Sequence, residues 1–430
     1  MTTPEPPLPR GGKSREAIAL AEIGVTHVTP RAARAMVIVF LMAVGIIPLA
    51  EWRAVATRGR EVVAVHAAKV RAVTHGGAWS RVVAKNRAVL EGLSEFEGAL
   101  EDESLIGRTL RPRAQAFMTG WLAVGNERVY AGREGWLFYR PDVEYLTGQP
   151  FLEPAQIQRR IRAAPEWTVP PAADPRPALV QFNRDLAARG ILLIVIPTPV
   201  KPGVHPEMMT ARLAGATDVV QNASYGALVE ELRTAGVQVF DPSDAIAAAR
   251  HAGPQYLATD THWTPEAMET AAAVASSVVS TALPSVPDPG YRVERAEIRG
   301  VGDVARMLDL PDSAALLQPE GVWVRRVLQP DGTLWRSSRD ADILLLGDSF
   351  SNIYSLESMG WGTSAGFGEH LSLALRRPLD RLVQNDEGAF ATRAMLQKDP
   401  ARLQGKRVVL YQFAVRELAQ GNWKVLPFAP

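Results

Sequence analysis

The sequence predicts an α/β sandwich with a mainly parallel sheet. Three observations support this fold class. Short apolar runs rich in β-branched residues recur along the chain, amphipathic segments separate them, and glycine or proline ends many of these segments. The apolar runs are read as buried strands, and they lie at Ile191–Ile196, 237–241 (VQVFD), Asp342–Leu346 and 407–413 (RVVLYQF). Strands that alternate with helices favour parallel pairing, because the helices supply the crossovers between neighbouring strands.

Three helices among these strands have recognisable ends. The helix before the first strand, PALVQFNRDLAARG, ends at Gly190, and the strand itself runs into prolines. The helix SYGALVEELRTAG ends at Gly236, directly before the second strand. A further helix begins after Thr264, whose hydroxyl suits an N-cap, with Pro265 at the first helical position.

The N-terminal part of the chain differs from this pattern. Residues 35–50, AMVIVFLMAVGIIPLA, contain no charge in sixteen positions, and arginines precede them at 31 and 34. This predicts a transmembrane anchor over 35–52, with 1–34 in the cytoplasm by the positive-inside rule. A buried core helix and a cleaved signal peptide are the alternatives. A helical stalk is expected over 53–124 and the main domain over 125–430, in the periplasm of a bacterium.

Composition excludes several classes of function. Lys and Arg number 47 against 46 Asp and Glu, so there is no basic excess for binding nucleic acid. The chain has no cysteine, which rules out disulfides, thiolate nucleophiles and cysteine-bound zinc. The histidines lack partner carboxylates at ligand spacing, and no phosphate-binding loop or dinucleotide fingerprint is present, so neither a metal nor a cofactor is expected.

A serine follows the predicted strand Asp342–Leu346 at the turn Gly347-Asp348-Ser349. The carboxyl edge of a parallel sheet is where ligands bind, so Ser349 could expose its hydroxyl there as a nucleophile. Its own backbone N–H could contribute to an oxyanion hole. An ordinary turn is the alternative, since this tripeptide is common without any chemistry.

The pentapeptide DTHWT at 260–264 supplies the partners that such a serine needs. Asp260 and His262 stand two positions apart, so in an extended loop they project to the same side. The carboxylate could fix one ring nitrogen of His262 and leave the other to accept the proton of Ser349. The alternative makes Asp260 a turn residue before a capped helix, with His262 merely exposed.

Taken together, DTHW and the later GDSFS resemble the AlgJ/AlgX-type alginate O-acetyltransferases, whose catalytic domain is SGNH-hydrolase-like. Other matching pieces are GREGWLFY at 132–139, IPTPVKPGVHPE at 196–207 and VVLYQFAVREL at 408–418. The resemblance spans about 125–425 and also covers the apolar lead-in. It implies an SGNH-like three-layer sandwich, in which Asp and His precede Ser in the chain, and a catalytic triad of Asp260, His262 and Ser349.

The resemblance implies a function and partners as well. The function is O-acetylation of an exported polysaccharide, alginate-like, through an acetyl-serine intermediate, by a protein anchored in the inner membrane. The acetyl donor would be supplied by a membrane-bound O-acyltransferase of the MBOAT type. Two alternatives stay open: an esterase that removes acetyl groups with the same triad, and a non-catalytic polysaccharide-binding scaffold of a secretion complex.

Four further polar residues are candidates for contacts with the substrate: Lys201, Tyr354, Asn385 and Arg416. Lys201 and His205 follow the strand Ile191–Ile196 and could meet an anionic sugar. A proline-rich loop with solvated charges is the alternative. Tyr354, Asn385 and Arg416 lie in suitable regions, and a structural or merely exposed role is the alternative for each. The segment GWLFY is expected to pack in the core.

Overall fold

The computed structural model describes residues 29–428 except 75–76, 166–167 and 387. The chain divides into two compact units, 1–111 and 112–430, which are described separately. Most of the expected cytoplasmic segment, residues 1–28, lies outside the described residues.

The described part of the first unit is helical. Helix α2 (Pro30–Ala72) begins at Thr29, whose hydroxyl accepts a hydrogen bond from the N–H of Ala32, and α3 (Ala78–Glu103) packs against it. Gly92 on α3 allows this contact, because a Cβ there would lie only 2.7 Å from the ring of His66. Helix α4 (Leu105–Leu122) follows and runs across the boundary between the two units.

The expected transmembrane anchor at 35–52 is not supported. Among the described residues, no helix has both the length and the apolar character needed to cross a membrane. The uncharged run extends only from Ala35 to Ala50, and α2 continues past it through Glu51, Arg53 and further charged residues to Ala72. A bilayer core requires about 20 apolar residues.

The second unit is built on a five-stranded sheet. Its strand order is β4-β3-β9-β7-β8 and every neighbouring pair is parallel. The strands are β3 (Leu192–Thr198), β4 (Gln238–Val239), β7 (Ile343–Gly347), β8 (Asp380–Val383) and β9 (Val408–Ala414). The prediction of an α/β fold with a mainly parallel sheet is therefore confirmed.

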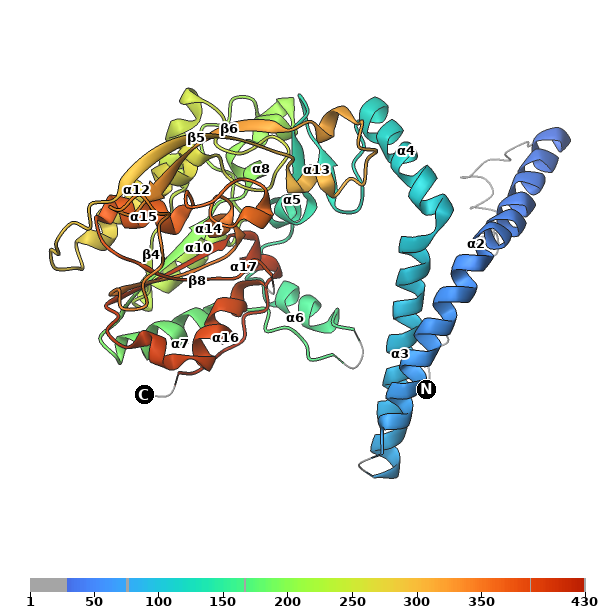
Figure 1. The fold of residues 1–430 in the computed structure, drawn as a ribbon, viewed down its shortest axis with the longest axis horizontal. Coiled ribbons are helices and arrows are strands. Elements are labelled where there is room, and N and C mark those ends of the chain that lie inside the picture. Colours follow the sequence, from blue (N-terminus) through green and yellow to red (C-terminus); the bar gives the residue numbers. More distant parts are fainter. Residues whose placement is uncertain (1–28, 75–76, 166–167, 387, 429–430) are drawn as a thin grey trace, which may run out of the picture. The chain divides into compact units, whose positions relative to one another are not determined.

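Helices cover both faces of this sheet (Figure 1). Alternate strand residues point to opposite faces, so Leu193 and Val195 join one core while Ile194 and Ile196 join the other. One face is covered by α7 (Arg176–Ala187), α10 (Tyr225–Thr234) and α16 (Ala391–Lys398). The other is covered by α12 (Pro265–Ser280) and α15 (Phe367–Leu375). Thr264 caps α12 as expected, accepting from the N–H of Ala267.

Two antiparallel ribbons and several short helices complete the unit. The ribbons pair β1 (Val129–Ala131) with β2 (Leu137–Tyr139), and β5 (Arg292–Gly300) with β6 (Glu320–Leu328). The short α-helices are α5 (Arg140–Thr147), α6 (Pro154–Arg162), α8 (Lys201–Val204), α9 (Pro206–Met209), α11 (Ser243–Ala249), α13 (Asp303–Arg306), α14 (Ser349–Asn352) and α17 (Arg416–Gln420).

The topology places three strand ends at one edge of the sheet. Strand β7 ends at Gly347 and leads into α14, β9 ends at Ala414 and leads into α17, and β3 ends at Thr198 before α8. Because these neighbouring strands are parallel, the residues that follow them meet at the carboxyl edge. The candidate site lies there.

Candidate active site

A short hairpin carries Asp260 and His262. Tyr256 and Trp263 form an antiparallel bridge, and the N–H of Leu257 donates to the carbonyl of His262 at 3.1 Å. The indole of Trp263 is fully buried, and its Nε1–H donates to the carbonyl of Phe350 at 3.1 Å. The hairpin is thereby attached to the residue that directly follows Ser349.

Asp260 is buried, and both of its carboxylate oxygens are occupied. Oδ1 lies 2.6 Å from Nδ1 of His262 and also accepts the backbone N–H of that residue at 3.1 Å. Oδ2 accepts Nε1–H of Trp361 at 2.9 Å and the backbone N–H of Asp303 at 3.0 Å. Four donors thus compensate a carboxylate that is only 2% exposed, which meets the requirement that a buried charge be hydrogen-bonded.

These contacts shift the pKa values of the pair in opposite directions. Burial alone would raise the pKa of Asp260, but the hydrogen bond to His262, its positive charge and the backbone donors lower it to about 2. Burial alone would lower the pKa of His262, but the hydrogen bond and charge of Asp260 outweigh it, so that pKa is raised. Asp260 is therefore ionised at neutral pH and holds Nδ1 of His262 as a hydrogen-bond donor.

Asp303 supports the same hairpin from α13. Its carboxylate accepts the N–H of Thr261 at 2.7 Å and the Thr261 hydroxyl at 2.9 Å, and its Oδ2 lies 4.0 Å from Nδ1 of His262. Burial and the nearby charge of Asp260 raise the pKa of Asp303 to about 6. Asp260, His262 and Asp303 lie close enough to share a metal ion. However, the carboxylate oxygens of Asp260 and Asp303 and Nδ1 of His262 are already engaged in hydrogen bonds.

The second ring nitrogen of His262 is available. Nε2 is buried and has no hydrogen-bond partner among the described residues, so the expected hydrogen bond to the Ser349 hydroxyl is not formed in this structure. The imidazole packs on the ring of Phe350, with the centroids 4.8 Å apart. His262 therefore contacts the neighbour of Ser349, and catalytic hydrogen bonds often shorten only when the substrate binds.

The turn that carries Ser349 is fixed by its neighbours. The carboxylate of Asp348 accepts the N–H of Phe350 at 2.9 Å and of Ala414 at 2.7 Å, and it also receives Nε2–H of Gln412 at 2.8 Å. Gly347 is required because a Cβ there would lie 2.4 Å from the hydroxyl of Ser351. The backbone around Ser349 is thus tied to the end of β9.

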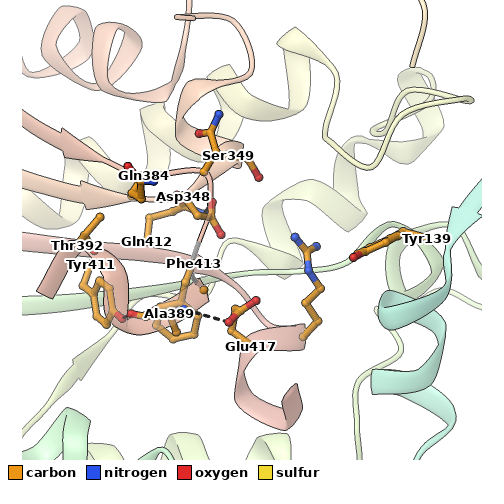
Figure 2. Close-up of a pocket in the computed structure, with 14 residues that line it drawn as sticks. Tyr139, Asp348, Ser349, Gln384, Ala389, Thr392, Tyr411, Gln412, Phe413 and Glu417 are labelled. Atoms are coloured by element: carbon orange, nitrogen blue, oxygen red, sulfur yellow. Dashed lines mark hydrogen bonds between the residues drawn. The ribbon is translucent and has the colours of Figure 1, made fainter. Parts of the chain in front are cut away.

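A cavity of about 190 Å³ opens beside this turn. Figure 2 shows Ser349 and Asp348 on one side of it, with Gln384 and Gln412 nearby and Tyr139 across the pocket. Asn385 and Arg416, both expected near a substrate, also line the cavity. The amide oxygen of Asn385 accepts a hydrogen bond from Asn352 at 2.9 Å, which holds the side chain against α14.

Arg416 is held in the cavity wall by Asp142. The guanidinium donates to Asp142 Oδ1 at 2.9 Å and lies 5.4 Å from the ring centre of Tyr139 and 5.9 Å from that of Phe350. Burial raises the pKa of Asp142 despite this ion pair, and Oδ2 of Asp142 has no hydrogen-bond partner in the described structure. Arg416 thus connects Asp142 on α5 with the aromatic ring next to Ser349.

Comparison with known proteins gives the family. Residues 129–415, about two thirds of the chain, match the family described as "SGNH hydrolase-like domain, acetyltransferase AlgX". The chain belongs to this family. The resemblance stated from the motifs is therefore confirmed, and with it the SGNH-like fold of the main domain.

Relatives in three pseudomonads bear the name "Probable alginate O-acetylase AlgJ". The Pseudomonas aeruginosa protein is 25% identical over 323 residues, covering 69% of this chain and 72% of the relative. The Pseudomonas putida protein is 25% identical over 312 residues, with the same coverage. The solved O-acetyltransferase domain of Pseudomonas putida AlgJ superposes with a TM-score of 0.50 at 23% identity, covering 68% of this chain and 93% of that domain.

Within this family fold, Lys201 supports the hairpin and does not face a substrate. Its ammonium is completely buried and donates to three backbone carbonyls: Leu137 at 2.5 Å, Ala258 at 2.7 Å and Asp260 at 3.0 Å. The alternative of a loop with solvated charges is wrong as well, because His205 is only 4% exposed and its Nε2 accepts the N–H of Gln255. The local polarity of the loop could not reveal carbonyls contributed by distant segments.

Tyr354 is also structural. It is fully buried, and its hydroxyl donates to the carbonyl of Trp263 at 2.7 Å, so it helps to fix the hairpin. Sequence reasoning missed Asp142, Asp303, Trp361 and Gln412. Each of them contacts the site across more than forty positions of sequence, and only Gln412 lies in a segment that was singled out, VVLYQFAVREL at 408–418.

The pKa of His262 predicts how acetyl-ester cleavage depends on pH. The imidazole must be neutral to accept a proton, so kcat/KM should rise with pH through a midpoint above 6.5, the ordinary value for histidine. In Asp260→Asn, burial still lowers the pKa of His262 but no carboxylate raises it, so the midpoint of the pH profile should fall. The rate of ester cleavage should also drop by about 10⁴-fold. Initial rates with a small acetyl ester from pH 5 to 9 would measure both. An unchanged midpoint in Asp260→Asn would contradict the assigned pair.

Lys201→Met should weaken both the fold and the site. It removes a donor from three carbonyls, and because the carbonyl of Ala258 still accepts the N–H of Leu137, the main loss is at Asp260. A buried acceptor left without a donor costs about 1–3 kcal/mol. We expect a lower midpoint in urea unfolding and a kcat reduced by at least about tenfold in the protein that remains folded.

Lys406→Met is the matched control. Lys406 is also buried and donates to the carbonyl of Ala341, but it lies before β9, at the opposite edge of the sheet from Ser349. It should lose stability with kcat nearly unchanged. Equal loss of kcat in the two variants would show that Lys201 has only a general structural role.

Proposed function

We propose that this protein O-acetylates hydroxyl groups of an exported, alginate-like polysaccharide through an acetyl-Ser349 intermediate. Membership of a family of acetyltransferase domains supports the reaction class, and relatives named as alginate O-acetylases support the polysaccharide. The observation that carries the proposed mechanism is the buried Asp260–His262 hydrogen bond of 2.6 Å, with Nε2 of His262 left free beside Phe350.

The first half-reaction forms the acyl-enzyme. Ser349 Oγ attacks the carbonyl carbon of an acetyl donor while its proton passes to Nε2 of His262. Asp260 stabilises the imidazolium, and the N–H of Ser349 faces the oxyanion. When the tetrahedral intermediate collapses, the bond to the donor breaks and the leaving group takes the proton from His262. The products are acetyl-Ser349 and a neutral histidine.

The second half-reaction transfers the acetyl group. A sugar hydroxyl gives its proton to Nε2 of His262 and attacks the acetyl carbonyl, and the collapse of this intermediate returns the proton to Ser349 Oγ. Arg416 and Asn385 line the cavity beside Ser349 and would position the donor or the acceptor. Water in place of the sugar would give hydrolysis, so an acetylesterase with the same triad is the alternative reaction.

A partner and a location belong to the same proposal. The resemblance to AlgJ/AlgX-type acetyltransferases supports an MBOAT-type membrane protein that would bring acetyl groups across the membrane. The catalytic domain would then work outside the cytoplasm, where the polymer is exposed. The apolar run at 35–50 would direct its export.

Substitutions in the proposed triad separate an enzyme from a scaffold. Ser349→Ala removes one oxygen from a half-buried position, so stability should change little while acetyl-ester cleavage falls by several orders of magnitude. His262→Ala should be similarly severe, and the double variant little worse, because triad members act as a unit. If cells with Ser349→Ala still make fully acetylated polymer, the protein is a scaffold.

Product analysis separates transfer from hydrolysis. Wild-type protein given an acetyl ester and an oligosaccharide acceptor should yield acetylated sugar by mass spectrometry, at the expense of free acetate. Free acetate as the sole product with every acceptor would favour the esterase.

The location can be tested with a reporter fused after residue 60. An alkaline phosphatase fusion, which is active only outside the cytoplasm, should be active, and the same position fused to a cytoplasmic reporter should be silent. The reverse pattern would overturn export of the catalytic domain.

A further inference from the structure

The first unit carries an apolar groove along its two long helices. Helices α2 and α3 run side by side (Figure 1), and the hollow along one side of this pair has a volume of about 510 Å³. Its apolar lining consists of Val63, Ala67 and Val70 on α2 and of Val89, Leu93 and Phe96 on α3. We call it the α2–α3 groove.

The lining residues have the spacing of a helix-packing surface. On each helix the three apolar residues lie at i, i+4 and i+7, so they form one continuous stripe. The stripes are open to solvent, since Val63 is 67% exposed, Leu93 53% and Val89 46%. Arg71 also lines the groove but is exposed, so its charge can stay in water. An apolar surface formed in this way marks a site of interaction with another molecule.

The two rims of the groove carry opposite charges at the same height. A Cβ on Gly92 of α3 would meet the ring of His66 on α2, and Nε2 of that ring lies 3.3 Å from Oε2 of Glu95. In this antiparallel register, Arg60 of α2 and Glu97 of α3 lie within about one helical turn of each other along the axis. At 100° per residue, both project to the side of the groove away from the α2–α3 contact. Both side chains are exposed.

We propose that the α2–α3 groove is the interface for a second copy of this chain, and that the two helix pairs form a four-helix bundle. A twofold axis parallel to the helices keeps every residue at the same height in both copies, and it places α2 of one copy beside α3 of the other. The apolar stripes would pack around this axis at the small crossing angle of such bundles, about 20°. Arg60 of each copy would meet Glu97 of the other, so this ion pair would form twice.

The charges on the rims favour a second copy over other occupants. A lipid chain would fill the groove but would offer no charge to Arg60 or Glu97. A single helix from another protein would need an acid for one rim and a base for the other, both at the right height. A second α2–α3 pair supplies both by symmetry. The interface involves the first unit alone and goes beyond the proposed acetyl transfer, on which it does not depend.

The association can be measured by sedimentation equilibrium of the full chain. We expect a dimer at micromolar concentration. Val63→Glu should weaken the dimer by at least about tenfold, because the apolar stripe would have to bury an unpaired carboxylate. Val65→Glu is the matched control, since Val65 is 51% exposed on the same helix but does not line the groove. A monomeric wild-type protein, or equal loss of association in the two variants, would overturn the proposal.

Exchanging the rim charges tests the symmetry of the interface. Arg60→Glu and Glu97→Arg each place like charges together at both ends of the interface, so each should weaken the dimer. The double variant restores opposite charges across the interface and should dimerise about as well as the wild type. Both positions are exposed, so the helices should stay folded, which far-UV circular dichroism would check. A double variant that dimerises more weakly than either single variant would contradict the arrangement.

Cross-linking gives a readout that does not require purification. The chain contains no cysteine, so a single introduced thiol reports only on its own position. In cells, Val63→Cys should be joined into a covalent dimer by a short bismaleimide, whereas Val65→Cys should remain monomeric. Absence of the dimer with Val63→Cys, or equal cross-linking at both positions, would contradict the interface. The same measurements in Ser349→Ala would give the same result whether or not the protein transfers acetyl groups.

Discussion

The structure of the site depends on satisfying one buried carboxylate. Asp260 is almost completely enclosed, and an unpaired carboxylate in that position would take up a proton rather than keep its charge. Donors from His262, Asp303 and Trp361 keep it ionised. Its charge in turn orients the imidazole and raises the pKa of His262. Every residue that fixes this hairpin therefore acts on His262, the proposed base for Ser349.

Hydrogen bonds hold the hairpin and the serine turn at the same edge of the sheet. Lys201 ties the hairpin backbone to the β2 ribbon, and Trp263 ties it to the carbonyl of Phe350. On the other side, Asp348 and Gln412 bind the serine turn to the end of β9. Trp263 contributes one hydrogen bond, whereas Lys201 donates three and the carboxylate of Asp348 accepts three. Removing one leaves an unsatisfied partner, so both stability and geometry should respond.

The sequence predicted the parts of this architecture that have local signatures. Three apolar strands, β3, β7 and β9, stood out because both faces of the sheet are covered, which makes central strands continuously apolar. Strand β8 was missed because Asp380 and Arg381 interrupt its pattern. The β5–β6 ribbon was missed because β5 is mostly exposed and carries charges.

The candidate site residues also divide into those that have a local sequence signature and those that do not. DTHWT and GDS are short motifs with fixed spacing, and they could be recognised directly. From the sequence, the loop of Lys201 suggested a solvated side chain, because it is rich in proline and charge. In the structure, three carbonyls from residues 57–64 positions away accept hydrogen bonds from its ammonium. The apolar run at 35–50 suggested a membrane span, although the helix that contains it continues with charged residues. Contacts formed by tertiary folding thus decided the role of Lys201, whereas the charged continuation of α2 bears on the apolar run.

The most direct test of the account is to locate the acetyl group on the enzyme. The wild-type protein would be incubated with a small acetyl ester, quenched in acid and digested, and the peptides would be sequenced by mass spectrometry. We expect acetylation of one residue, Ser349. This acetylation should be present in the wild type, absent in His262→Ala and lost again when an acceptor sugar is added before quenching. An acetyl group on another residue, or labelling of Ser349 that is equally fast without His262, would contradict it.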